Sequence, residues 1–535
     1  MVTPFKRSPE PYFETYDTHV PQGYVDENSF LRQSPQIEPL PSFNQSLGML
    51  PVPFWDGHAS VIDCYWKAWE LVFQNLSPAT KQNGFVGNYL DTAFNGNVFL
   101  WDSCFTTFFG VYGRRAFNFQ KTLDLFYAKQ HADGFICREI SGLNGRDAFH
   151  RFDPSSTGPN ILAWAEWNHF LHTGDHSRLA QVFPALMAYH IWTKTYRTWQ
   201  DGTYWTTGWG SGMDNLPRFA SPHHEWWSHG HLSWIDATLQ AILSAKILVR
   251  IANTVSRFDD NPLLQAEIDN LTRIVKETMW SEEDAFFYDR HPLGQLTGVK
   301  HIGSYWALFS EILLDFDEEK FIAHLSNPME FNRLHRIPAL SADHPSFDPN
   351  GGYWSGGVWA PTNYMVLKGL ETCGYADLAH EIARNHLESV VQVYESDDTP
   401  WENAEQFRQF FDLVRVQIDS SHTLWENYAP DCIKPGSMSK PGYVGWTGLP
   451  PIAVLIENIL GIRPGLDPTI LIWNVRLLER HGITNYPFGK TGTVDLCCMA
   501  RTSSSEEPHI EVKSNQPITI QLVWETGAST TKVNY

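Results

Sequence analysis

Helical periodicity recurs twelve times between residues 59 and 461, and this repetition constrains the fold more than any other feature of the chain. In the first stretch, which begins at Ala59 and ends near Asn75, the apolar side chains recur at helical spacing: Val61, Tyr65, Ala68, Trp69 and Val72. The other stretches lie at about 102–113, 115–131, 160–174, 177–199, 231–254, 262–280, 303–314, 317–325, 357–374, 376–397 and 443–461. Many are joined by short turns, so we predict six helical hairpins and an all-α fold, an (α/α)6 barrel of six inner and six outer helices.

Long loops rich in glycine, proline and tryptophan separate the predicted hairpins. They cover residues 132–159, 200–229, 282–302, 341–356 and 398–442. Connections of this length are uncommon inside a domain and are usually functional, so we expect the functional site on them. No short sequence repeat is present, which argues against a solenoid with a strict motif.

Two regions of different composition flank the predicted barrel. Residues 1–57 are rich in proline, asparagine, serine and glutamine and have no helical period, so they predict an extended N-terminal arm that wraps the surface. Residues 58–463 form the predicted catalytic barrel. After about Pro464 the chain alternates as strands do, for example in Thr469–Trp473 and Ile518–Val523. Residues 464–535 therefore predict a small C-terminal antiparallel β appendage, with either a binding or a stabilising role.

The charge balance excludes some classes of partner. The chain carries 39 basic and 60 acidic residues, a net charge of −21, whereas a nucleic-acid surface needs a basic footprint. No apolar run reaches the length of a membrane span, and the N-terminus shows no signal peptide. We therefore expect a neutral small-molecule partner, which the loop residues described below identify as a small carbohydrate, and neither nucleic acid nor membrane. We also expect a cytoplasmic protein, or a secreted or periplasmic one if a signal peptide has been removed. No sequence feature indicates an oligomeric state.

An acid on a glycine- and proline-rich loop is the first candidate for catalysis. Asp214 lies in Trp209-Gly-Ser-Gly-Met-Asp-Asn-Leu-Pro-Arg218, where the composition predicts a loop. Four tryptophans are close in sequence: Trp205, Trp209, Trp226 and Trp227. The alternative is a helix N-cap, a position that aspartate favours. Against it, Asn215 and Pro217 follow, and no amphipathic helix begins before about His231.

A second acid lies in similar company far downstream. Glu426 is flanked by Trp425 and Tyr428, and apolar neighbours raise the pKa of a carboxyl group or position it against a sugar ring. The alternative is an exposed loop acid. Two carboxyl groups on aromatic-rich loops are what glycosidic bond cleavage requires, so we predict Asp214 and Glu426 as a catalytic pair.

Other loop segments supply candidates for sugar binding, because a tryptophan face covers the apolar face of a pyranose. Asp102, in Trp101-Asp-Ser-Cys-Phe105, serves either as a helix cap or as an acceptor for sugar hydroxyls. Arg138 and Glu139 are either part of the site or a structural ion pair. In the glycine-rich segment from Gly351 to Tyr364, Trp354 and Trp359 either wall a ligand or pack in the core.

Several common chemistries lack their sequence signals. The glycine-rich segment does not have the spacing of a phosphate loop, and the predicted fold does not alternate strands and helices as nucleotide folds do. The 22 histidines include no HExxH motif, and no GxSxG elbow is present. We therefore predict no metal, no cofactor and no serine nucleophile.

Five segments together resemble a known clan of enzymes. They are Trp101-Asp-Ser103 with Phe105, Asp133-Gly134 with Arg138-Glu139, Ser211–Asn215 with Arg218-Phe219, Trp354–Trp359 with Asn363-Tyr364, and Trp425–Tyr428. In this order, across roughly residues 60 to 460, they are similar to the trehalase-like clan of glycoside hydrolases, families 63 and 37, especially the mannosylglycerate and glucosylglycerate hydrolase type. One position departs from the family: its Trp-Arg-Gly segment is Trp354-Ser355-Gly356 here.

The resemblance implies an (α/α)6 barrel and an inverting, exo-acting hydrolase of a short α-linked glycoside, such as an α-glucoside, an α-mannoside or a glycosylglycerate. Asp214 would be the general acid and Glu426 the general base. Trp101 and Asp102 would bind the terminal sugar, and Trp354 and Trp359 would close the pocket. Matching the motifs adds these substrate-binding candidates: Phe105, Arg138, Trp209, Asn363, Tyr364 and Trp425.

Two other classes of function remain as alternatives. A non-catalytic carbohydrate-binding protein would keep the barrel and the tryptophans, but the presence of both acids argues against it. A polysaccharide lyase on a related helical toroid would need a basic cleft for its acidic substrate, which a chain of net charge −21 supplies poorly.

Overall fold

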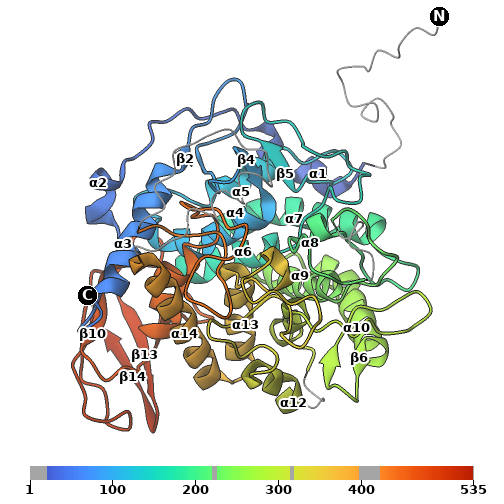
Figure 1. Ribbon diagram of the computed structural model, residues 1–535. Coiled ribbons are helices and arrows are strands. Elements are labelled where there is room, and N and C mark those ends of the chain that lie inside the picture. The colour runs from blue at the N-terminus through green and yellow to red at the C-terminus, as the bar shows by residue number, and fades with distance from the viewer. Residues whose placement is uncertain (1–20, 220–225, 314–317, 397–421, 534–535) are drawn as a thin grey trace, which may run out of the picture.

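The computed structural model describes residues 21–219, 226–313, 318–396 and 422–533 (Figure 1). Residues 1–20 of the predicted arm and 398–421 of the last predicted loop lie outside the described residues. In the part that is described, no helix is long and apolar enough to cross a membrane.

A helix overlaps each of the twelve predicted stretches. They are α3 (Ala59–Gln74), α4 (Leu100–Gly110), α5 (Lys121–Ala128), α6 (Leu162–Thr173), α7 (His176–Tyr196), α9 (Ile235–Thr254), α10 (Asn261–Thr278), α11 (Trp306–Phe309), α12 (Glu318–Ala323), α13 (Ala360–Thr372), α14 (Ala376–Glu395) and the π-helix η8 (Leu449–Ile459). The predicted ends are less accurate than the predicted places. The stretch at 303–314, for example, is a 3-10 turn, η5 (Ile302–Tyr305), followed by the single turn of α11.

Six of these helices form a closed order of neighbours. Helix α4 packs against α6, α6 against α9, α9 against α11, α11 against α13, α13 against η8, and η8 packs back against α4. Helices α3, α5, α7, α10 and α14 each pack against one or two of these six.

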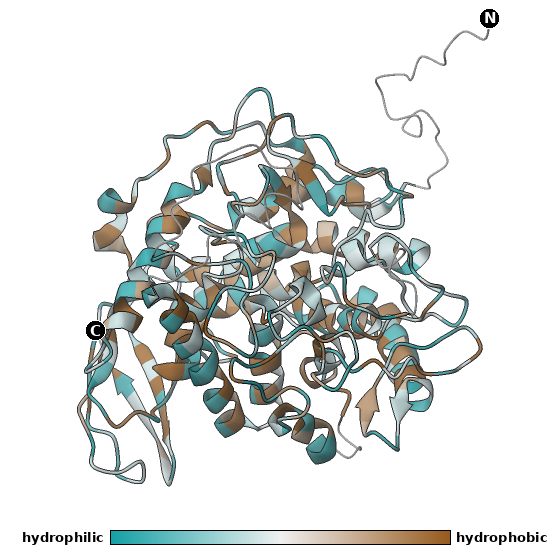
Figure 2. Cartoon of the chain, in the orientation of Figure 1, coloured by the Kyte–Doolittle hydropathy of each residue, from teal (hydrophilic) through white to brown (hydrophobic). Residues whose placement is uncertain are grey.

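Burial distinguishes the two groups of helices. All eleven residues of α4 are buried, whereas α10 buries only one face: Leu264, Glu267, Ile268, Leu271, Ile274 and Val275. An apolar stripe of this kind is the pattern of a helix with one side in water. Figure 2 shows the same two-sidedness as brown and teal stretches that alternate along helices at the periphery.

Each long loop comes directly before one of the six helices in the closed order. The loops at 132–159, 200–229, 282–302, 341–356 and 398–442 precede α6, α9, η5 with α11, α13 and η8 respectively. Four of these five loops, all except 282–302, contribute residues to one cavity, which is described below.

The C-terminal region forms two four-stranded sheets. Their strands are β1 (Val52–Trp55), β8 (Ile462–Pro464), β9 (Ile470–Asn474), β10 (His481–Phe488), β11 (Gly492–Cys498), β12 (Ile510–Ser514), β13 (Ile518–Trp524) and β14 (Gly527–Val533), in the orders β1-β10-β11-β12 and β14-β13-β9-β8. The prediction of an antiparallel appendage is wrong for one pair, because β9 and β13 run parallel. The chain between them builds the other sheet and returns in the same direction, which is the crossover that a parallel pair needs.

The predicted arm takes part in this β structure. Strand β1 pairs antiparallel with β10, with Val52 opposite Thr484 and Trp55 opposite His481. The described part of the arm is also less extended than predicted, because it contains the short helices α1 (Gly23–Glu27) and α2 (Phe43–Ser46). Ser42 and Gln45 form a capping box that begins α2.

Candidate active site

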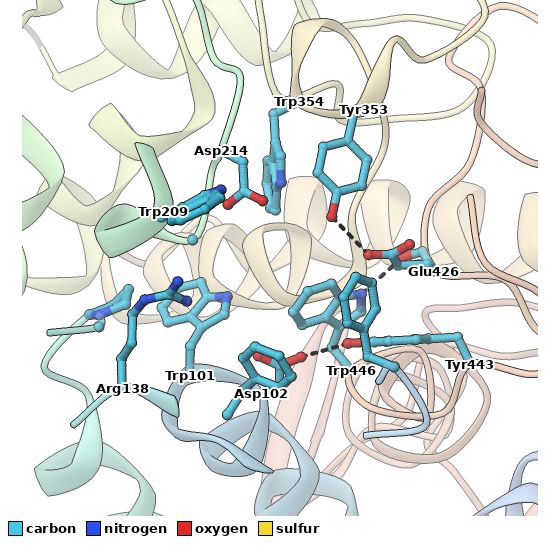
Figure 3. Close-up of a pocket in the computed structure, with 15 residues that line it drawn as sticks. Trp101, Asp102, Arg138, Trp209, Asp214, Tyr353, Trp354, Glu426, Tyr443 and Trp446 are labelled. Carbon is cyan, nitrogen blue, oxygen red and sulfur yellow. Dashed lines mark hydrogen bonds between the residues drawn. The ribbon is translucent and has the colours of Figure 1, made fainter. Parts of the chain in front are cut away.

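A cavity of about 560 Å³, its open mouth included, lies where the long loops meet (Figure 3). Its lining is aromatic with three acids and one arginine: Phe94, Phe99, Trp101, Asp102, Arg138, Gly158, Pro159, Trp209, Gly212, Asp214, Tyr353, Trp354, Glu426, Tyr443 and Trp446. The cavity is open to solvent and is lined mainly by rings.

Seven of the twelve predicted site residues line this cavity: Trp101, Asp102, Arg138, Trp209, Asp214, Trp354 and Glu426. They come from segments that are far apart in sequence, at the start of α4, before β5 (Glu139–Ser141), in and after α8 (Gly208–Ser211), on η7 (Tyr353–Ser355) and in the loop before η8. The fold thus brings both predicted catalytic acids to one cavity.

Two of the remaining predicted residues lie behind the lining. The Trp359 ring stacks on Trp354 with centroids 3.9 Å apart and an angle of 1°, so Trp354 lies between it and the cavity. Phe105, one helical turn after Trp101, packs edge-on against that indole at 4.7 Å and is fully buried. Both support a ring that lines the cavity.

Three other predicted residues are fixed by contacts elsewhere. The Asn363 side chain bonds the backbone N–H and C=O of Ile337 at 2.8 and 3.0 Å. The Tyr364 hydroxyl donates to Glu457 on η8, at 3.0 Å from the nearer oxygen. Trp425 is fully buried beside Glu426. In this structure none of the three lines the cavity.

Eight lining residues were not predicted: Phe94, Phe99, Gly158, Pro159, Gly212, Tyr353, Tyr443 and Trp446. Tyr353 lies in the glycine-rich segment beside Trp354, and Tyr443 and Trp446 lie among Pro441, Gly442 and Gly445 just before η8. The pattern that singled out Trp354, aromatic rings among glycines before a helix, could have found these three.

The local backbone places Asp214 in the cavity. Thr207 caps the one-turn helix α8 by accepting from Gly210 N–H, and Gly212 then takes a left-handed conformation at φ 74°. A side chain at Gly212 would meet the Trp101 indole at 3.1 Å, so glycine also permits this close approach. No described helix begins at Asp214, which removes the alternative of a helix cap.

Glu426 is buried, not an exposed loop acid. Its side chain is 1% exposed. The Tyr353 hydroxyl donates to one carboxyl oxygen at 3.1 Å, and the Lys440 backbone N–H donates to the other at 3.3 Å. The Trp446 indole N–H also donates to the Glu426 backbone oxygen at 2.9 Å. Both oxygens of this carboxyl group therefore have donors.

Asp214 has a different environment. It is only partly covered and faces the open cavity between Trp209 and Trp354 (Figure 3). Within the described ranges, no other residue donates a hydrogen bond to its carboxyl group. The neighbouring charges oppose each other, since Arg138 lowers its pKa and Glu139 raises it.

All three acids in the cavity have raised pKa values. Burial raises the pKa of Asp214 to about 7 and that of Glu426 to about 8, the donors on Glu426 opposing the shift. Burial also raises the pKa of Asp102 to about 7, against the Tyr443 hydroxyl that donates to it at 2.6 Å. Acids that titrate near neutrality are suited to proton transfer.

Arg138 combines both roles that the sequence left open. It lies 3.5 Å from Glu139 as an ion pair and donates through Nε to Ser155 O at 2.7 Å. Its guanidinium also lies over the rings of Phe149 and Trp209, at 4.4 and 5.7 Å from their centroids, while it lines the cavity.

Across the described residues, no group of three or more histidine, cysteine or acidic side chains is placed to hold a metal ion.

Comparisons with known proteins point to one family. The model of the mannosylglycerate hydrolase MGH1-like glycoside hydrolase domain matches residues 96–408. A protein of Borreliella burgdorferi with no assigned function is 25% identical over 402 residues, 74% of this chain and 78% of that protein. The mannosylglycerate hydrolase of Thermus thermophilus is 22% identical over 386 residues, 59% of this chain and 89% of the relative. The crystal structure of a GH63 mannosylglycerate hydrolase from Thermus thermophilus in complex with Tris and D-glycerate has a TM-score of 0.56 at 18% identity, covering 73% of this chain and 99% of its own.

Proposed function

The chain belongs to the family of mannosylglycerate hydrolase MGH1-like glycoside hydrolase domains and is a glycoside hydrolase, and from this premise we propose that it removes the terminal sugar of a short α-linked glycoside with inversion of configuration. The substrate is an α-glucoside, an α-mannoside or a glycosylglycerate. The observation that carries the proposal is that Asp214 and Glu426 face one cavity from separate loops, in different hydrogen-bond environments.

In the proposed reaction the two acids act at the same time. Asp214 gives its proton to the glycosidic oxygen as the bond from the anomeric carbon to that oxygen breaks. Glu426 takes a proton from a water molecule whose oxygen forms the new bond to the anomeric carbon from the opposite face. The acids exchange protons with solvent before the next turnover, so no oxidant or cofactor is consumed.

The hydrogen bonds support this division of roles. The donors on both oxygens of Glu426 favour its ionised form, which is the form that a general base needs. Asp214 accepts no such bond from another described residue, so no donor of this kind favours its ionised form over the protonated form that a general acid needs. Burial raises the pKa of both acids, that of Glu426 the more, so the division of roles rests on the hydrogen bonds and not on the order of the pKa values.

The rest of the lining supports sugar binding. Asp102 and Tyr443 form a hydrogen-bonded pair whose remaining oxygen lone pairs can accept from hydroxyl groups of the terminal sugar. Trp101, Trp209, Trp354 and Trp446 line the same cavity, and a tryptophan face can cover the apolar face of a pyranose. The proposal includes the (α/α)6 barrel as its scaffold, which the closed order of six neighbouring helices supports.

The test is hydrolysis of a panel of α-linked disaccharides and glycosylglycerates, with the released sugar followed by proton NMR. We expect the β anomer to appear first and the α anomer to follow by mutarotation. Initial release of the α anomer would contradict inversion. Sugar binding without hydrolysis across the panel would favour a non-catalytic carbohydrate-binding protein.

We expect kcat/KM to depend on pH in a bell-shaped profile whose maximum lies near neutral pH. Activity requires protonated Asp214 and ionised Glu426, so the rate falls at high pH as Asp214 loses its proton and at low pH as Glu426 gains one. With pKa values of about 7 and about 8, only a minor fraction of the enzyme holds both forms together, and kcat/KM should peak between pH 7 and pH 8. A plateau or a maximum below pH 5 in steady-state measurements would contradict these raised values.

A further inference from the structure

The segment before α13 holds Tyr353 in a backbone conformation that its side chain disfavours. Tyr353 has a φ of 60° and follows Gly351 and Gly352, which have φ values of 111° and 52°. Glycine adopts the left-handed region freely, but a bulky residue is strained there and keeps this conformation only where its surroundings hold it. Something in the neighbourhood must therefore fix Tyr353.

The Asn215 side chain bonds both peptide groups of Tyr353. Its Oδ1 accepts the Trp354 backbone N–H at 2.8 Å, and its Nδ2 donates to the Gly352 backbone oxygen at 2.9 Å. The Gly352 oxygen belongs to the peptide group before Tyr353 and the Trp354 N–H to the one after it. One amide therefore fixes the planes on both sides of Tyr353, which determines its φ and ψ.

A second contact strengthens the same junction. The Ser355 hydroxyl donates to the Asn215 backbone oxygen at 3.2 Å, and Asn215 Nδ2 is 3.3 Å from that hydroxyl. The two segments are about 140 residues apart in sequence, so these bonds are tertiary contacts between the Asp214 loop and the glycine-rich segment.

The far end of the Tyr353 side chain reaches Glu426. Its hydroxyl donates to Glu426 Oε1 at 3.1 Å (Figure 3), and its ring packs edge-on against Trp359 at 4.9 Å. Asn215 itself does not line the cavity, although its neighbour Asp214 does. A continuous set of contacts thus leads from the residue after the proposed acid to the proposed base.

We propose that Asn215 is a positioning residue: by clamping Tyr353 in its left-handed conformation, it holds the tyrosine hydroxyl on Glu426 and so ties the loop of the acid to the base. This inference rests on the proposed roles of Asp214 and Glu426. Asn215 acts through Tyr353 and touches neither the substrate nor the reacting atoms. Without the clamp, Tyr353 relaxes, Glu426 loses the donor on Oε1, and its ionised form is less stable.

The test compares Asn215→Ala, Tyr353→Phe and the double variant in kcat/KM across pH. Each single variant should lower kcat/KM about 10- to 100-fold, the size expected for a hydrogen bond to a charged group. The loss should be largest on the acidic side of the profile, where the small ionised fraction of Glu426 limits kcat/KM, and it should vanish at high pH. The acidic limb of log kcat/KM is therefore displaced to higher pH while the basic limb stays in place. Because both remove one interaction, the double variant should be no worse than the poorer single variant.

The matched control is Asn350→Ala, because Asn350 is an exposed asparagine on the same segment whose side chain bonds Asp348 and Lys434. It should keep the wild-type profile. Thermal unfolding checks that each variant is folded, and Asn215→Ser, whose side chain is too short to bond both peptide groups, replaces Asn215→Ala if that variant does not fold.

Two outcomes would overturn the inference: an Asn215→Ala profile with the wild-type acidic limb while Tyr353→Phe shifts it, or losses that multiply in the double variant. Failure of the proposed function gives a different result. In that case Glu426→Gln retains activity and Tyr353→Phe leaves the acidic limb in place.

Discussion

Replacing Asp214 by asparagine is expected to lower kcat on an unactivated α-glycoside about 100- to 10,000-fold, the usual contribution of a general acid or base. The side chain keeps its size and stays in a cavity that Asp102, Tyr443 and four tryptophans also line, so sugar affinity should change little. Steady-state kinetics and binding of the product sugar measure the two quantities separately.

The leaving group distinguishes the roles of the two acids. A glycosyl fluoride needs no proton on its leaving group, so Asp214→Asn should recover most of its loss on that substrate. Glu426→Gln should be impaired on both substrates, because water must still be activated. The matched control is Glu381→Gln, an exposed acid on α14 paired with Arg336. Equal losses of Asp214→Asn on both substrates would show that Asp214 is not the acid.

Replacing Arg218 by alanine is expected to lower the free energy of unfolding by about 3–5 kcal/mol, as for a broken buried ion pair. Arg218 is 1% exposed, and its guanidinium bonds Asp236 and Asp289, which are equally buried. It also lies over the Trp234 ring, 4.2 Å from the centroid. Alanine would leave the carboxylates of Asp236 and Asp289 buried without the guanidinium that neutralises them. Arg218 is also close in sequence to Asp214, so its loss would disturb the loop that carries the acid.

The comparison for this prediction is Arg273→Ala. Arg273 pairs with Glu277 one turn later on α10, with both side chains more than half exposed, and such surface pairs contribute about 0–1 kcal/mol. Chemical unfolding followed by tryptophan fluorescence measures both variants. If Arg218→Ala lowered the free energy of unfolding no more than Arg273→Ala, the buried ion pairs of Arg218 would not stabilise the fold, and the prediction would be wrong.

The places of the peripheral helices were predictable from sequence because helices such as α10 bury a periodic apolar face. The ends were not, since caps and tertiary contacts decide them. Helix α5, for example, begins at Lys121 although the apolar pattern begins at 115. The parallel pairing of β9 with β13 could not be predicted either, because the partner and direction of a strand depend on the tertiary fold and not on its own sequence.

The sequence predicted the site residues whose type is unusual for their surroundings. It did not predict which of several similar residues have side chains that point into the cavity. Asp214 and Glu426 are acids among glycine, proline and aromatic residues, and the fold brings them to one cavity. Trp354 and Trp359 are identical in type and five residues apart, yet only Trp354 lines the cavity while Trp359 stacks behind it. Composition does not distinguish the ring in front from the ring behind.

The pairing of β1 with β10 also affects how the chain is made. The two strands are separated by about 430 residues, so β1 leaves the ribosome long before its partner exists. At about 5–20 residues per second the delay is roughly 20–90 seconds. Helix α3, which follows β1, packs against η8 and waits almost as long. Strand β1 and helix α3 are therefore made early relative to their partners, and the helical order and its adjoining sheet can close only after η8 and β10 have emerged.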